Sequence, residues 1–177
     1  MKKLKGLLLS LVFLTISWSA PAWCDEYLVQ RLSAGQLKRG CDLSLYAIET
    51  ERVAIGRPDH TVDLRWICED GKSRIIDTYQ IEGGSPQVIT ILFRRNRHII
   101  VLVKWEARSR NADVFGDYYK IYAYQYAPTS VDKLFPVDRN LMSKLGEGWE
   151  GDVAGKSVHF PYKDAAAIRK ALDRFGY

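Results

Sequence analysis

Three histidines are the residues best suited to acid–base or metal chemistry: His60, His98 and His159. An imidazole titrates near neutral pH and binds zinc, so a histidine beside a carboxylate can serve a hydrolase. The spacing fits no such site, because the sequence has neither an HExxH helix signature nor a GxSxG turn. We therefore expect structural histidines, no catalytic residue, no metal and no cofactor. An enzyme acting through His60 or His159 is the alternative.

A glycine-rich acidic segment surrounds Trp149. It carries three glycines and the carboxylates of Glu147, Glu150 and Asp152. The stagger of these acids does not match an EF-hand calcium loop. A large aromatic side chain in a mobile acidic loop is typical of an interface hot spot. An ordinary surface loop, with the tryptophan tucked into the core, fits the same pattern. We take these four residues as one candidate partner-binding surface.

A cluster of arginines forms a second candidate surface. Arg94, Arg95 and Arg97 flank Asn96 in the short connection between two apolar runs. Arginine binds carboxylates and phosphates through two parallel hydrogen bonds, so this tip suits an acidic partner. Charge at the end of an apolar hairpin also limits aggregation, which is the simpler explanation.

The three cysteines that follow the leader favour one disulfide. Cys41 and Cys68 lie inside the expected domain, whereas Cys24 lies at its beginning. We predict the Cys41–Cys68 pair, which leaves Cys24 free or available for a dimer. No CxxC motif or close His/Cys set supports metal binding.

The centre of the chain has the pattern of an antiparallel meander. Alternating or continuous apolar runs, separated by turn residues, predict five strands at 61–68, 74–81, 88–93, 99–105 and 118–126. The runs 88–93 and 99–105 are apolar on both faces, so we expect both to be central and covered on both sides. Asn96 suits a left-handed turn position between them. Residues 25–32 fit a short helix capped by Asp25 or an opening strand.

The last of these strands carries a row of tyrosines on one face: Tyr118, Tyr122, Tyr124 and Tyr126. Such a row can form a platform for sugar or peptide, but we expect it to pack beneath a C-terminal helix. Asp164 can cap that helix, and Ile168, Ala171, Leu172 and Phe175 form its apolar stripe. The predicted fold is α+β: an antiparallel β-meander of about five strands with the C-terminal helix packed on the sheet.

The first 22 residues predict the compartment. A lysine-rich start, a short apolar run and Ala20-Pro21-Ala22 are typical of a cleaved signal peptide. The apolar run is too short to span a bilayer, so we expect no membrane anchor after cleavage. Cleavage leaves residues 23–177 as a single exported domain and lowers the formal charge from +5 to +2. So small a charge argues against nucleic-acid binding.

These features predict a periplasmic or secreted, non-catalytic domain that binds a protein partner in the cell envelope. A specific version is an inhibitor or immunity protein against a secreted toxin or a wall-degrading enzyme. The alternative is an envelope hydrolase acting on glycan or peptide.

Overall fold

The computed structural model describes residues 25–49, 59–111, 113–131 and 133–177. The predicted signal peptide and Cys24 lie outside the described residues. Four antiparallel strands form one sheet: β1 (Glu26–Ser33), β2 (Cys41–Glu49), β3 (His60–Cys68) and β4 (Ser73–Tyr79). Five antiparallel strands form another: β5 (Gln87–Arg94), β6 (His98–Ser109), β7 (Val114–Gln125), β8 (Glu147–Val153) and β9 (Lys156–Val158). The helices are α1 (Arg139–Leu145) and α2 (Ala165–Arg174).

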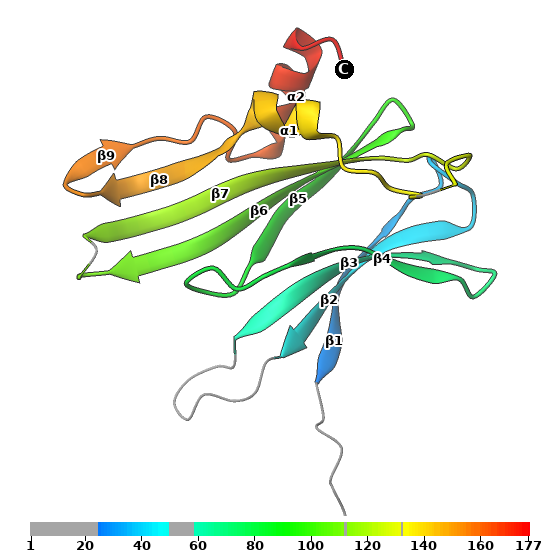
Figure 1. The fold of residues 1–177 in the computed structure, drawn as a ribbon, viewed down its shortest axis with the longest axis horizontal. Helices are drawn as coiled ribbons and strands as arrows, with labels where there is room; N and C mark the ends of the chain where they lie inside the picture. The colour runs from blue at the N-terminus through cyan, green and yellow to red at the C-terminus, as the bar shows by residue number, and fades with distance from the viewer. Residues whose placement is uncertain (1–24, 50–58, 112, 132) are drawn as a thin grey trace, which may run out of the picture.

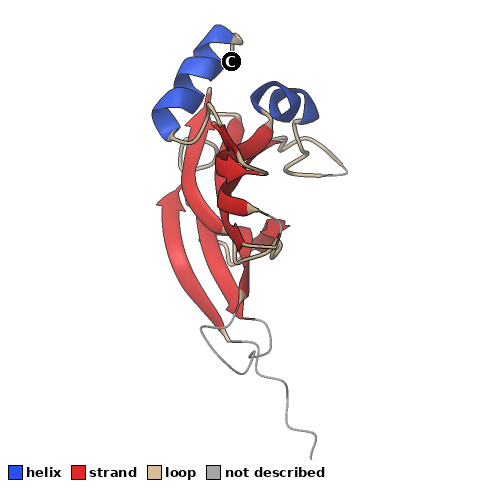
Figure 2. Ribbon diagram, turned by 90° about the vertical axis from the view of Figure 1, so that its left-hand side faces the viewer, coloured by secondary structure: helices blue, strands red, loops and turns tan. Residues whose placement is uncertain are grey.

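The elements stack in three layers, with the five-stranded sheet in the middle (Figure 1). Both helices lie on the same side of the strands (Figure 2). One core fills the space between the sheets, and a second lies between the five-stranded sheet and the helices. Strand β6 contributes side chains to both cores, because Val101 faces the first core and Ile100 faces the second. The chain is therefore mostly β-structure, built around one strand that is buried on both faces.

The five central strands are present, but the single meander predicted for them is wrong. Strands β3 and β4 belong to the first sheet, and β5 to β7 belong to the second. The chain crosses between the layers at residues 80–86, where the Trp105 indole Nε1 donates to the Gln80 carbonyl oxygen at 2.8 Å. A sheet with one apolar face must bury that face against another layer. Crossing at this point lets the two sheets cover each other.

Two expectations about coverage need correction. Strand β6 is central and buried, as predicted, but β5 is an edge strand with alternating exposure. The tyrosine face of β7 packs against the four-stranded sheet and not under the C-terminal helix. Tyr124 is buried there, and its hydroxyl donates to Asp77 Oδ2 of β4 at 2.6 Å. The opposite face of β7, with Ile121 and Ala123, meets the helices.

Other local predictions are confirmed. Cys41 and Cys68 are direct cross-strand partners and form a disulfide with a Cα–Cα distance of 4.0 Å. Helix α2 begins after Asp164, whose carboxylate accepts a hydrogen bond from the Ala167 amide at 2.8 Å. Asn96 is left-handed, with φ of 49°. The segment 25–32, for which the sequence leaves both a helix and a strand open, lies mostly in strand β1.

Candidate functional site

The predicted arginine tip is the turn between β5 and β6, and two of its arginines make intramolecular contacts that stabilise the fold. Arg94 Nε donates to the Tyr177 carbonyl oxygen at 2.9 Å, and its guanidinium pairs with Asp173. When the Gln125 side-chain amide is oriented with its oxygen facing Arg97, that oxygen accepts hydrogen bonds from Arg97 Nε at 2.6 Å and Nη2 at 2.7 Å. These contacts tie the tip to the C-terminal residues and to the end of β7. Arg95 is exposed.

The acidic segment around Trp149 is strand β8, not the expected mobile loop. A Cβ on Gly116 of β7 would lie 2.4 Å from the Glu150 carbonyl oxygen, and a Cβ on Gly151 would lie 2.5 Å from the Phe115 carbonyl oxygen. Glycine is therefore needed on both strands for the backbones to approach this closely. Gly151, one of the glycines that suggested mobility, instead permits strand pairing with Gly116.

The acids of β8 also make intramolecular contacts. Glu147 lies 3.0 Å from Lys120 Nζ, which lowers the pKa of the carboxyl. Glu150 accepts hydrogen bonds from Lys163, from His159 Nδ1 at 3.2 Å and from the Phe160 amide at 3.0 Å. The Lys163 contact, followed by the other two, lowers the Glu150 pKa to about 2.

Trp149 is half-buried, with its ring centroid 5.0 Å from that of Tyr118, and Asp152 is exposed. The structure does not bring this region and the arginine tip together. Trp149 is paired with Tyr118 and His98 with Gln125, seven residues further along β7. At about 3.3 Å per residue, these points are roughly 23 Å apart. The two candidate surfaces are therefore separate.

The histidines are also dispersed. His98 is buried beside Asp138, 3.5 Å from its Oδ2, and burial lowers its pKa. The His60 amide donates to Ser85 Oγ at 3.0 Å. His159 is largely exposed. No group of three or more His, Cys, Asp or Glu side chains suited to a metal ion occurs among the described residues.

A surface not singled out from the sequence is the outer edge of β1. In the described part of the chain β1 pairs only with β2, so its other edge carries unpaired backbone groups. Three consecutive apolar side chains are exposed there, Tyr27 at 47%, Leu28 at 48% and Val29 at 54%. A register shift between Leu28 and Gln30 marks a bulge at Val29. Long apolar edge strands are templates for pairing with another chain.

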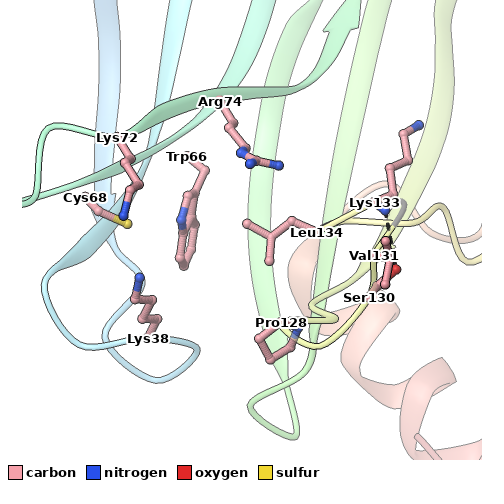
Figure 3. Close-up of a pocket in the computed structure, with 10 residues that line it drawn as sticks. All are labelled: Lys38, Trp66, Cys68, Lys72, Arg74, Pro128, Ser130, Val131, Lys133 and Leu134. Atoms are coloured by element: carbon pink, nitrogen blue, oxygen red, sulfur yellow. Dashed lines mark hydrogen bonds between the residues drawn. The ribbon is translucent and has the colours of Figure 1, made fainter.

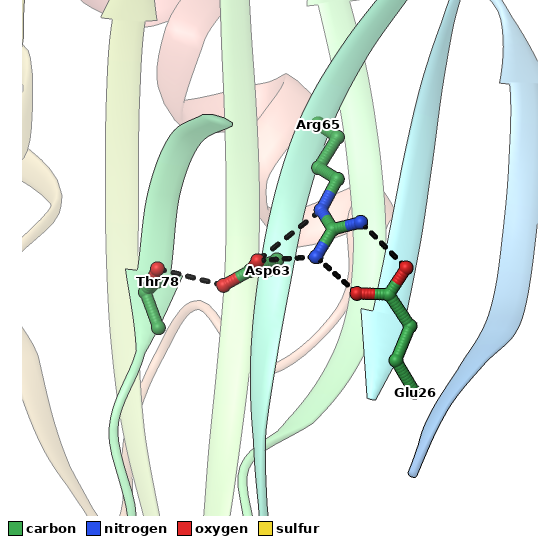
Figure 4. A network of polar contacts seen from close by, with 4 residues as sticks. All are labelled: Glu26, Asp63, Arg65 and Thr78. Carbon is green, nitrogen blue, oxygen red and sulfur yellow. Dashed lines mark hydrogen bonds and ion pairs between the residues drawn. The ribbon is translucent and has the colours of Figure 1, made fainter. Parts of the chain in front are cut away.

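Polar contacts across the outer face hold this edge strand in place (Figure 4). Arg65 of β3 donates from Nη1 and Nη2 to the two carboxylate oxygens of Glu26 in β1, at 2.9 and 2.6 Å. It also donates from Nε and Nη2 to Asp63 Oδ2, at 3.2 and 2.8 Å. The Thr78 hydroxyl of β4 donates to Asp63 Oδ1 at 2.7 Å. Arg65 lies over the Tyr46 ring of β2, 4.5 Å from its centre, so the network touches all four strands.

The charges in this network stabilise one another. The hydrogen bonding between Glu26 and Arg65 is the main cause of both pKa shifts: it lowers the pKa of Glu26 and raises the pKa of Arg65. Paired hydrogen bonds between ionised groups are stronger and more directional than neutral ones. The network therefore holds β1 in an extended position on the sheet.

Comparisons with protein-family models, with curated proteins and with solved structures found no match. None of the helices in the described part of the chain is long and apolar enough to cross a membrane. The function must therefore be argued from the geometry of this chain. A tyrosine–leucine–valine run was visible in the sequence, but only the strand order makes it an edge.

Proposed function

We propose that the chain is an exported, non-catalytic protein-binding domain that takes an extended segment of its partner onto β1 as an added strand. The exposed edge of β1, with Tyr27, Leu28 and Val29, is the observation that carries this proposal. Strand addition uses backbone hydrogen bonds for affinity and side-chain contacts for specificity. Such an edge selects a protein partner, because only a polypeptide supplies the matching row of amides and carbonyls.

The energetics allow a specific complex. Each backbone hydrogen bond formed on pairing contributes on the order of 1 kcal/mol net. Burying the exposed halves of three apolar side chains adds roughly 1 kcal/mol each. The Glu26–Arg65 contact keeps β1 extended, so little backbone order is lost on binding. An inhibitor or immunity protein against a secreted toxin or wall-degrading enzyme is the narrower form of the proposal.

Export is part of the proposal and is supported by the Cys41–Cys68 disulfide, since disulfides persist in oxidising compartments. The signal peptide remains a prediction from residues 1–22, and so does a dimer through Cys24.

The test is affinity capture from envelope and culture-supernatant fractions, followed by hydrogen exchange on the purified complex. Leu28→Lys should abolish capture of a stoichiometric partner. Ile75→Lys is the matched control, because Ile75 is 59% exposed on β4, the opposite edge of the same sheet. We expect protection of the β1 amides in the complex. Protection confined to Trp149 or Arg95 would move the partner to the surfaces predicted from sequence and overturn the β1 site.

One contact favours the alternative of an envelope hydrolase acting on glycan or peptide. His159 Nδ1 lies 3.2 Å from Glu150 Oε1, which is the kind of histidine–carboxylate pair used in general acid–base catalysis. Turnover of wall fragments or peptides that disappears in His159→Ala would support this second candidate. Turnover that is absent from the parent protein would remove it.

A further inference from the structure

A basic pocket lies at one end of the space between the layers, and Cys68 of the disulfide is among its lining residues (Figure 3). Its volume is about 230 Å³. One wall comes from the β1–β2 and β3–β4 turns with the start of β4, and the other from the segment that follows β7. The lining includes Lys38, Lys72 and Arg74 from the first wall and Lys133 from the second.

The charged side chains that line the described part of the pocket are of one sign. They are four cations, and none of the described lining residues is acidic. Lys72 pairs with Asp70 at 2.9 Å, outside the lining. Among the described residues, no acidic group lies within ion-pair distance of Lys38, Arg74 or Lys133. Lys38 also interacts electrostatically with the Asp70 carboxylate. Four cations gathered around one hollow concentrate positive potential, which attracts an anion.

The floor of the pocket is apolar. Trp66 stands directly opposite Arg74 in the β3–β4 pairing, so both side chains project to the pocket side of the sheet. The indole ring is 3% exposed and packs on Phe135, with centroids 5.1 Å apart. Leu134 and Pro128 extend this apolar lining. A ligand that fills the pocket therefore meets the apolar side chains of Pro128 and Leu134 beside the cations, with only the edge of the Trp66 indole accessible.

The indole N–H of Trp66 makes no hydrogen bond to an acceptor among the described residues. It is not a fully buried orphan, because His98 Nδ1 is the one buried side-chain atom without a partner in the described part of the chain. In Figure 3 the indole nitrogen lies on the side of Lys38 and Lys72. This N–H is a donor available to an oxygen of a bound anion.

We propose that this pocket binds a small organic dianion that carries its charges on carboxylate or phosphate groups and has an apolar ring or chain as its body. Arg74 and Lys38 bind the charged groups, and the body packs on Pro128 and Leu134. The volume corresponds to about eight waters at roughly 30 Å³ each, which fits one small ring with its substituents. The site is independent of the β1 edge and adds a small-molecule ligand to the proposed protein partner.

The test is isothermal titration calorimetry on the parent protein with four probes that separate charge from apolar body. Isophthalate and phenyl phosphate carry both, inorganic phosphate carries charge alone, and phenol carries the ring alone. We expect binding of isophthalate or phenyl phosphate, at least tenfold tighter than inorganic phosphate and phenol. The stronger of the first two identifies the preferred anionic group. Absence of binding by both at 10 mM, or equal binding of phenol or of inorganic phosphate, would overturn the proposal.

Variants then locate the site. Arg74→Gln and Lys38→Gln should each weaken binding of the better probe by about tenfold, since each removes a charge-assisted hydrogen bond. Arg39→Gln is the matched control, because Arg39 is exposed in the same turn as Lys38 but does not line the pocket. These surface changes leave the core intact, and unchanged circular dichroism will confirm folding. An equal loss in the Arg39 variant would show diffuse charge attraction and overturn the site.

Discussion

Replacement of Arg65 by methionine should destabilise the four-stranded sheet more than any other change on its outer face. The side chain of Asp63 is 4% exposed and that of Arg65 is 17% exposed. Arg65→Met leaves the aspartate buried with only the Thr78 hydroxyl as a side-chain partner. Methionine keeps most of the packing over Tyr46, so the loss reports mainly on the charge.

The magnitude follows from burial. Removing one partner of a buried ion pair costs about 3–5 kcal/mol. Because Thr78 still donates a hydrogen bond to Asp63, we expect the loss of unfolding free energy from the unpaired aspartate to lie near the lower end of this range, at about 3 kcal/mol. Glu26 is 42% exposed, so its pairing with Arg65 is screened by solvent and contributes at most about 1 kcal/mol. We expect the unfolding free energy to fall by about 3–4 kcal/mol.

Urea unfolding of the oxidised protein, followed by far-ultraviolet circular dichroism, measures this loss. Glu26→Gln should lower the unfolding free energy by less than about 1 kcal/mol. The double variant Arg65→Met/Asp63→Asn should recover more than half of the stability lost in Arg65→Met, because it removes the unpaired charge. A loss below about 1 kcal/mol for Arg65→Met, at an unchanged denaturant slope, would refute the view that this network is a buried pair.

Four further outcomes are expected. Cys41→Ser should lower the unfolding free energy by about 3.5 kcal/mol in oxidising buffer, and the difference from the parent should disappear when both are reduced. Gly116→Ala should weaken the β7–β8 pairing and cost about 1–3 kcal/mol, seen as faster hydrogen exchange in β8. The lowered pKa of Glu150 means that its ionised form stabilises the fold at pH values above the ordinary carboxyl pKa. Urea unfolding at a series of pH values should show this stability disappearing as the pH falls from about 4.5 to about 2. The Glu150→Gln variant should not show this loss. The lowered pKa of His98 means that the unfolded chain binds a proton first, so stability should fall as the pH drops below about 6.5, and His98→Gln should flatten that dependence.

Local features of the fold were predictable from local sequence. The Asp164 cap and the apolar stripe of α2 lie within one short segment, and so does the Asn96 turn. The Cys41–Cys68 pair followed from compartment and position. In each case the interaction that decides the structure is close in sequence or limited to a few alternatives.

Features that depend on contacts between layers were not predictable. Gly148 and Gly151 suggested a loop, because nothing in one chain segment indicates that Gly116 lies opposite Gly151. Strand β5 is as apolar as β6, yet it is an edge, since the crossing at residues 80–86 separates it from β4. The side chains that line the basic pocket come from three segments that are distant in the sequence, so no spacing in the sequence predicts the pocket.

The order of the strands has a consequence for folding kinetics. Within each sheet every strand lies beside the one that precedes or follows it in the chain. Most of the strand pairing therefore closes short loops; the exception is β7–β8, whose connection, residues 126–146, contains α1. Such local topologies form faster than sheets assembled from distant strands. We expect the docking of the two sheets, which completes the burial of β6, to come later than the pairing within each sheet. Substitutions of the β6 residues that face the first core, such as Val101, should slow this docking, whereas changes at the β3–β4 turn should affect an earlier event.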